Sequence, residues 1–164
     1  MLETTLYSVL FFLFGSAIGS FLNVVILRAP RRKSIVKNRS HCPKCKHNLS
    51  ILDLIPVWSF PFLRGQCQYC KKKISWQYPL VEAITGIVFV LGFLVLGFSL
   101  ESLFFAIYAS FLIAIFVLDY TKYIIPDFLS VPAMFIGLLG SIIITISDSK
   151  IFSISALTGL FVNL

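Results

Sequence analysis

The sequence predicts an all-α integral membrane protein built as a polytopic helix bundle. Of its 164 residues, 58% are hydrophobic, and the mean hydropathy is +0.93. A helix needs about 20 apolar residues to cross the ~30 Å hydrocarbon core of a bilayer, and several uncharged runs come close to that length. The cations are gathered rather than spread, because 12 of the 14 lysines and arginines lie within residues 28–79.

The uncharged runs predict four full spans and the start of a fifth. The first run is too long for a secretory signal, has no basic segment before it and is followed by cations, so we interpret it as a retained anchor. The runs cover residues 4–27, 83–100, 102–118, 128–147 and 151–164. We therefore expect residues 1–27 to form the first transmembrane helix and residues 80–164 to form the other membrane helices.

Small and polar residues mark one part of the first helix. Gly15 and Gly19 lie one turn apart, as do Ser16 and Ser20. Small residues at this spacing let a neighbouring helix approach closely. Asn23 is a polar amide in the same helix, so we expect it to face protein or water rather than lipid.

Residues 28–79 form a basic loop that contains a single acid, Asp53. Basic loops of up to about 60 residues between spans tend to stay in the cytoplasm. This places the N-terminus outside, in a multi-pass protein of the cell's inner or plasma membrane. The net charge of +7 is then explained by a basic loop that stays on the cytoplasmic side and contacts lipid headgroups. We therefore expect no nucleic-acid partner.

All four cysteines lie in this loop, in two C-x2-C pairs separated by 21 residues: Cys42-Pro-Lys-Cys45 and Cys67-Gln-Tyr-Cys70. This spacing approximates that of a four-thiolate zinc site. The neighbouring lysines favour the thiolate form that binds metal; they are Lys44, Lys46, Lys71 and Lys72. Disulfides, a redox pair and four unligated thiols are the alternatives. The reducing cytosol favours metal over structural disulfides, so we predict a zinc-knuckle loop.

The loop also contains an aromatic, proline-broken segment, residues 51–63, which is too short to span the membrane. Trp58, Phe60 and Phe62 suit a segment that lies on the membrane surface or packs over the helices. Glu82 follows at the start of the second helix, where a carboxylate usually faces the bundle interior or a water-filled cavity. Pairing with a loop cation and a direct chemical role are the two alternatives for Glu82.

Asp119 ends the uncharged run of the third helix, and Asp127 precedes the fourth. A membrane tolerates an acid near the interface without any function, so the residues alone leave both a catalytic Asp119 and an Asp119 without function open. Asp127 fits an ordinary acid at a helix N-terminus, with capping as one role. An aspartyl hydrolase needs two carboxylates that share a proton. Asp119 and Asp127 are eight residues apart with Pro126 between them, so helix periodicity does not place them side by side. We therefore identify no persuasive second carboxylate.

A string of motifs resembles the type IV prepilin leader peptidase family, which includes bifunctional prepilin peptidase/N-methyltransferases. The resemblance covers nearly everything from Gly15 to about Pro132. The matching segments, in order, are Gly19-Ser-Phe-Leu-Asn-Val-Val-Ile-Leu-Arg-Ala-Pro30, Ser40-His-Cys-Pro-Lys-Cys45, Asp53-Leu-Ile-Pro-Val-Trp-Ser, Arg64-Gly-Gln-Cys-Gln-Tyr-Cys70, Ile74-Ser, Tyr78-Pro-Leu-Val-Glu82 and Asp119 to Asp127.

The resemblance implies a polytopic aspartic peptidase that cleaves the leader of prepilins or pseudopilins on the cytoplasmic side. Many members of the family then methylate the new N-terminal amine with S-adenosylmethionine. The resemblance also implies that Asp119 is the first catalytic aspartate and that the four cysteines belong to the family's cytoplasmic cysteine loop.

The family's second catalytic aspartate lies in a later Gly-x-Gly-Asp motif, which the 164 residues do not contain. The expectation is therefore an N-terminal portion of such an enzyme, either truncated or completed by another segment, and inactive alone. Two rivals belong to other classes. One is a catalytically incomplete, membrane-anchored zinc-binding module of a pilus, secretion or competence system. The other is a thiol redox protein of the membrane.

Overall fold

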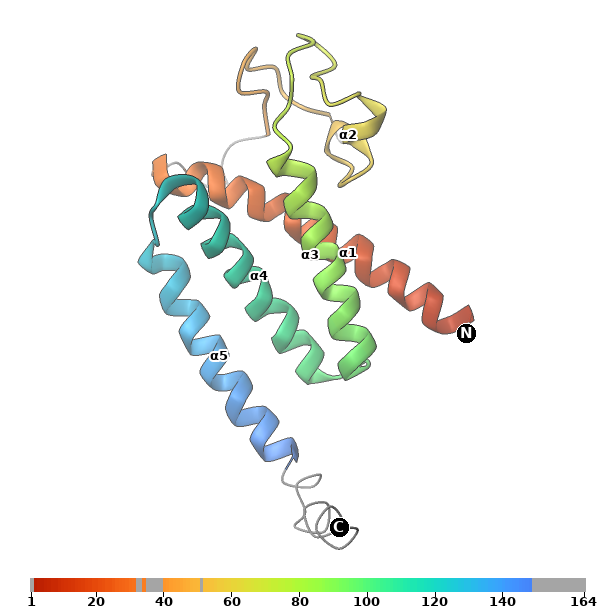
Figure 1. The fold of residues 1–164 in the computed structure, drawn as a ribbon, viewed down its shortest axis with the longest axis vertical. Coiled ribbons are helices and arrows are strands. Elements are labelled where there is room, and N and C mark those ends of the chain that lie inside the picture. Colours follow the sequence, from red (N-terminus) through yellow and green to blue (C-terminus); the bar gives the residue numbers. More distant parts are fainter. Residues whose placement is uncertain (1, 32–33, 35–39, 51, 149–164) are drawn as a thin grey trace, which may run out of the picture.

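The computed structural model describes residues 2–31, 34, 40–50 and 52–148, and within these ranges the chain is helical with no strand. Four long helices dominate (Figure 1): α1 (Leu2–Arg28), α3 (Gln77–Leu96), α4 (Leu100–Lys122) and α5 (Asp127–Asp148). Three short helices accompany them: η1 (Ala29–Arg31), η2 (Leu52–Leu54) and α2 (Ser59–Phe62). The predicted all-α architecture is confirmed.

Three of the helices, α1, α3 and α4, are long and apolar enough to cross a membrane. The apolar helical segment of α5, Asp127–Ile143, is shorter than these three candidate spans. The run expected to begin a fifth span, residues 151–164, lies outside the described residues. The protein is therefore a helical membrane protein with at least three helices of spanning length.

The close crossing of α1 and α3 depends on glycine (Figure 1). A Cβ on Gly19 would lie 2.7 Å from the Cα of Glu82, and one on Gly15 would lie 2.7 Å from the Cγ of Phe89. Real Cβ atoms do not approach other carbons this closely, so any larger residue would push the helices apart. The predicted packing role of the small residues in α1 is confirmed.

One end of the bundle holds the apolar core and carries the loop between α1 and α3. At this end α1 and α4 finish while α3 and α5 begin (Figure 1); we call it the loop end. A buried cluster joins all four helices there, consisting of Leu22, Val25, Ile26, Val81, Ala114, Leu118 and Leu129. Because residues from four helices share this cluster, the ends of the helices and the loop segments attached to them are positioned together.

Local capping produces the two tight turns that return the chain between helices. Gly97 ends α3 with a φ of 68°, and Ser99 begins α4 in a reciprocal capping box with Ser102. At the other end of α4, Tyr123 adopts the left-handed conformation and its N–H donates to the carbonyl of Asp119. These turns make α3, α4 and α5 successive antiparallel neighbours.

We expect Gly19→Ala to destabilise the bundle by about 1–3 kcal/mol, because overpacking a tight helix contact costs that much. The measurement is the thermal unfolding midpoint of the purified protein in detergent. Gly140→Ala is the matched control, because a Cβ at Gly140 would meet its nearest neighbour at an ordinary 3.6 Å. Equal midpoints for the two variants would contradict the close crossing.

Candidate functional site

The first cysteine pair forms a tight knuckle. The N–H of Cys42 donates to the carbonyl of His47 (3.0 Å), and the N–H of Lys46 donates back to the carbonyl of Cys42 (2.9 Å). Lys46, directly after Cys45, has a φ of 59°. This left-handed residue reverses the chain, and so both sulfurs of the pair can serve one site.

The second pair repeats the same local structure. The N–H of Cys67 donates to the carbonyl of Lys72 (2.9 Å), and the N–H of Lys71 donates to the carbonyl of Cys67 (2.9 Å). Lys71, directly after Cys70, has a φ of 55°. The two knuckles therefore share one backbone structure, although the residues between their cysteines differ, Pro-Lys in the first and Gln-Tyr in the second.

The two knuckles bring their four sulfurs together. All four Sγ atoms lie within 4.8 Å of one another, and those of Cys42 and Cys70 are 3.9 Å apart. A tetrahedron with Zn–S bonds of about 2.3 Å has edges of about 3.8 Å, whereas a disulfide requires about 2.05 Å. The rings of His47 and Tyr69, one from each knuckle, lie 3.7 Å apart between centroids and join the knuckles beside the sulfurs. The donor set fits a tetrahedral, thiolate-bound metal ion.

The surroundings of Cys42 favour ionisation of its thiol. Its burial raises the pKa, but hydrogen bonds from the backbone N–H groups of Cys45 and Lys44 and from the thiols of Cys45 and Cys67 outweigh this effect and lower the pKa to about 7. Although a backbone hydrogen bond from His47 lowers it, burial and contacts with the other thiols raise the pKa of Cys45 to about 11. Cys42 is therefore the thiol that ionises before Cys45, and the thiolate is the form that binds metal.

Glu82 ties the loop to the bundle. Its side chain is only 9% exposed, and its Oε2 accepts a hydrogen bond of 2.7 Å from the backbone N–H of Val57. Ser20 of α1 hydrogen-bonds to the same carboxylate. Glu82 thus faces the interior as expected, but its loop partner is a backbone N–H rather than a cation. Val57 has a φ of 64°, an unfavourable value for a β-branched residue, so this hydrogen bond helps to hold a strained segment in place.

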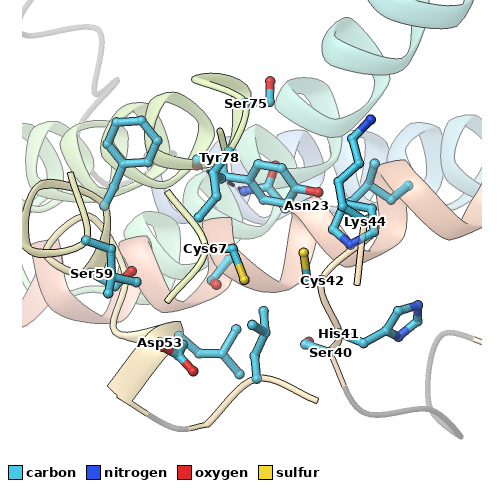
Figure 2. Close-up of a pocket in the computed structure, with 18 of the residues that line it drawn as sticks. Asn23, Ser40, His41, Cys42, Lys44, Asp53, Ser59, Cys67, Ser75 and Tyr78 are labelled. Carbon is cyan, nitrogen blue, oxygen red and sulfur yellow. Dashed lines mark hydrogen bonds between the residues drawn. The ribbon is translucent and has the colours of Figure 1, made fainter. Parts of the chain in front are cut away.

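A cavity of about 780 Å³ lies between the knuckles and the loop end of α1 and α3. Figure 2 shows Asn23 and Tyr78 on its helix side, Asp53 on the opposite side, and Cys42 and Cys67 between them. The cysteine loop and the membrane helices therefore enclose one shared space.

Asn23 is the most buried polar side chain that lines this cavity. It is 2% exposed, and its Nδ2 donates to the carbonyl of Tyr78 at 3.1 Å (Figure 2). Its Oδ1 is buried without a hydrogen-bond partner among the described residues. The expectation that Asn23 faces protein or water is confirmed.

The aromatic segment of the loop divides into inward and outward side chains. The ring of Phe60 packs on Trp76, with centroids 4.6 Å apart, and it also covers Gly65. Trp58 remains more than half exposed, and Phe62 is 80% exposed. The segment thus carries outward apolar side chains of the kind expected at a membrane surface.

Asp119 lies apart from the cavity. It is exposed in the last turn of α4, next to the buried Leu118, at the loop end. Asp127 is also exposed and begins α5. The N–H of Ser130 donates to the carbonyl of Pro126, so Pro126 occupies the capping position and Asp127 lies within the first turn. Asp119 is not among the residues that line the cavity.

The fold and site define a helical membrane protein with a four-cysteine knuckle loop enclosing a cavity at one end. Residues 13–96 match the family described as Bacterial Peptidase A24 N-terminal domain. The prepilin leader peptidase/N-methyltransferase of Myxococcus xanthus is 39% identical over 133 residues, 81% of this chain and 40% of that protein.

Two further relatives are similar. The type 4 prepilin-like proteins leader peptide-processing enzyme of Escherichia coli is 37% identical over 77% of this chain and 54% of its own length. The prepilin leader peptidase/N-methyltransferase of Bacillus subtilis is 37% identical over 71% of this chain and 47% of its own length. No solved structure matches the chain. The chain belongs to the prepilin leader peptidase family, and it spans about half the length of these curated relatives.

We expect Glu82→Ala to detach the loop while Glu82→Gln largely preserves it. The alanine variant leaves the Val57 N–H without its acceptor, and a hydrogen bond to a charged group is worth about 1.5–3 kcal/mol; the glutamine oxygen can still accept. The measurement is the rate of limited proteolysis within residues 40–76. Equal rates for the wild type and both variants would contradict the anchoring role.

Proposed function

We propose that this protein acts in cleaving the leader peptide of type IV prepilin-like substrates at the cytoplasmic face of the membrane. The observation that carries the proposal is the family match over residues 13–96, together with relatives whose names state prepilin leader peptidase activity. Prepilins or pseudopilins are the proposed substrates. Their apolar helices would lie in the membrane beside the bundle, with the leader on the cytoplasmic side.

Asp119 is the proposed catalytic aspartate. Its position supports this role, because an exposed carboxylate at the end of a spanning helix is accessible to a peptide bond at the membrane face. The carboxylate would act as base on the attacking water, and a second carboxylate would hold the proton that the leaving amine requires. We assign that second role to an aspartate of the family's Gly-x-Gly-Asp motif rather than to Asp127, which lies in the first turn of α5.

Zinc is the proposed metal of the knuckle loop, with Cys42, Cys45, Cys67 and Cys70 as its ligands. The sulfur geometry and the lowered pKa of Cys42 support it. We propose a structural role, because four thiolates leave no open coordination position for a substrate. The knuckles are short and contain little apolar core, so metal binding would supply much of the loop's folding free energy.

S-adenosylmethionine is the proposed second cofactor, supported by the N-methyltransferase activity in the relatives' names. It would supply an electrophilic methyl group for the new N-terminal amine that leader cleavage releases. Cleavage must then precede methylation, because that amine does not exist until the leader is removed.

The proposed membrane arrangement has four full spans, with α5 as the fourth and residues 151–164 beginning a fifth. Residues 1–27 would be the first span, 28–79 the cytoplasmic loop and 80–164 the membrane part of the peptidase. The basic loop supports a cytoplasmic loop end and an outside N-terminus. Lipid headgroups would contact the basic loop and the exposed side chains of Trp58 and Phe62.

A membrane-anchored zinc-binding module without peptidase activity is the second candidate function. One observation favours it: Asp119 lies outside the cavity, and the other acid of α4, Glu101, lies in the first turn at the opposite end of that helix. Such a module would hold components of a pilus, secretion or competence system. Loss of leader cleavage on substitution of Asp119 separates the two candidates.

We expect close to one equivalent of zinc per chain, lost in Cys42→Ser because three thiolates hold the ion less tightly than four. The measurement is elemental analysis of protein purified without oxidant. Gln68→Ser is the matched control, since it alters the other knuckle between its two ligands and should keep the metal. Disulfides in place of metal would refute the zinc site.

We expect a membrane-impermeant thiol reagent to label Phe98→Cys on intact cells, because the turn after α3 would lie outside. Ser75→Cys should remain unlabelled until the membrane is opened. Both residues are exposed in the folded protein, so accessibility differs only through the membrane. The reverse pattern would overturn the orientation and, with it, the argument from a reducing compartment.

We expect Asp119→Asn to reduce prepilin cleavage by at least 10²–10⁴-fold, the usual contribution of general acid–base catalysis, because an amide cannot accept the proton of water. The measurement is leader cleavage by the full-length protein in reconstituted membranes. Asp127→Asn should be much milder, since a charge at a helix N-terminus contributes only about 0.3–1 kcal/mol. Similar losses in both variants would instead indicate that both carboxylates are catalytic.

A further inference from the structure

Two hydrogen bonds fix the short helix α2 and its flanking residues to the start of α3. The N–H of Val57, just before α2, donates to Glu82 in the second turn of α3 (2.7 Å). The N–H of Ile74 donates to the carbonyl of Gly65, just after α2 (2.8 Å). Figure 1 shows α2 at the level where α3 begins. Because α3 is a candidate membrane span, these bonds hold residues 57–65 at the depth where that span leaves the membrane.

The aromatic side chains of this segment suit that depth. Trp58 and Trp76 are the two tryptophans of the sequence, and both are more than half exposed. The ring of Phe60 packs on Trp76, which directly precedes α3, and Phe62 is almost fully exposed. Tryptophan is enriched where a membrane protein meets the headgroups. The segment therefore presents its apolar side chains where lipid begins.

A hollow of about 390 Å³ lies between the end of α2 and the second knuckle. It is separate from the larger cavity and falls within the range of about 300–1,000 Å³ that holds small ligands. Arg64 and Lys71 supply two cations to its lining, and Gln66 and Gln68 supply two amides. No acid is among the described residues that line it, whereas the exposed Phe62 is. The hollow therefore combines positive charge, hydrogen-bond donors and one apolar side chain.

The two cations of the hollow lack a counter-charge. Among the residues that the structure describes, neither the guanidinium of Arg64 nor the ammonium of Lys71 forms a hydrogen bond or an ion pair. Cys67 also lines the hollow but is buried, so the cations and amides are its accessible polar groups. The backbone of Arg64 is fixed, because its N–H donates to the carbonyl of Pro61 (3.0 Å). A guanidinium held in place can bind two phosphate oxygens at once.

We propose that this hollow binds the phosphate of an anionic phospholipid, with Arg64 and Lys71 on the phosphate oxygens and Phe62 against the upper part of the acyl chains. The inference assigns one specific site within the general headgroup contact of the basic loop, and it does not depend on leader cleavage. A free phosphate ion has the same oxygens but no chains. The exposed ring at the hollow and the depth of the segment therefore favour the lipid.

The test is tryptophan fluorescence, because Trp58 and Trp76 both report on the segment at the interface. The chain is reconstituted in phosphatidylcholine nanodiscs that contain a minor fraction of brominated lipid, which quenches tryptophan on contact. Brominated phosphatidylglycerol should quench several-fold more strongly than the same fraction of brominated phosphatidylcholine. Arg64→Met and Lys71→Met should each lower this preference by up to about fivefold, the usual contribution of one cation near an anionic membrane surface.

Lys46→Met is the matched control, because Lys46 is the left-handed lysine at the equivalent place in the first knuckle and lines the other cavity. It removes the same charge away from the hollow and should keep the wild-type preference. Equal losses in Lys46→Met and Lys71→Met would show only general attraction to an anionic surface and overturn the site. So would a wild-type chain without the preference, or displacement of the lipid by soluble glycerol phosphate. Zinc content and helical circular dichroism identify a misfolded variant, in which case the other of Arg64→Met and Lys71→Met decides.

Discussion

The hydrogen bond between the Glu82 carboxylate and the backbone N–H of Val57 is the constraint on which the site depends. Glu82 lies on α3 opposite Gly19 of α1, where the two helices are in close contact. Its buried carboxyl group would be costly without hydrogen-bond partners, and the loop supplies one. The same bond holds Val57 in an unfavourable backbone conformation. Helix packing and loop position are therefore coupled at a single residue.

The cysteine cluster and Asp119 lie apart at the loop end of the bundle. The cysteine cluster and the cavity beside it are built from α1, the loop and the start of α3, whereas Asp119 ends α4. The buried cluster that includes Val81 and Leu118 connects the two regions. In the proposed enzyme, leader cleavage at Asp119 would thus take place on the same membrane face as the cysteine loop but apart from it.

The paired knuckles explain how a short loop can form a defined wall. Among the described residues, each knuckle is closed by three backbone hydrogen bonds and includes one left-handed lysine. This is little local stability against the entropy lost in ordering the chain. Four thiolates around one ion would connect segments far apart in sequence, and the His47–Tyr69 contact packs them beside the sulfurs. The loop is therefore held from both sides, by its cysteines at one end and by Glu82 at the other.

The sequence alone determined the helical membrane class, the small-residue face of α1, the interior position of Asn23 and the pairing of the cysteines into two knuckles. These features follow from the run length of apolar residues and from residue types at fixed spacing, which are local properties. Only the tertiary structure decided that Glu82 binds the N–H of Val57, that the Oδ1 of Asn23 is unpaired, and that a cavity lies between loop and helices. A backbone N–H is present at every residue except proline, so no residue pattern identifies Val57 as a partner. A cavity, likewise, exists only once segments distant in sequence have packed together.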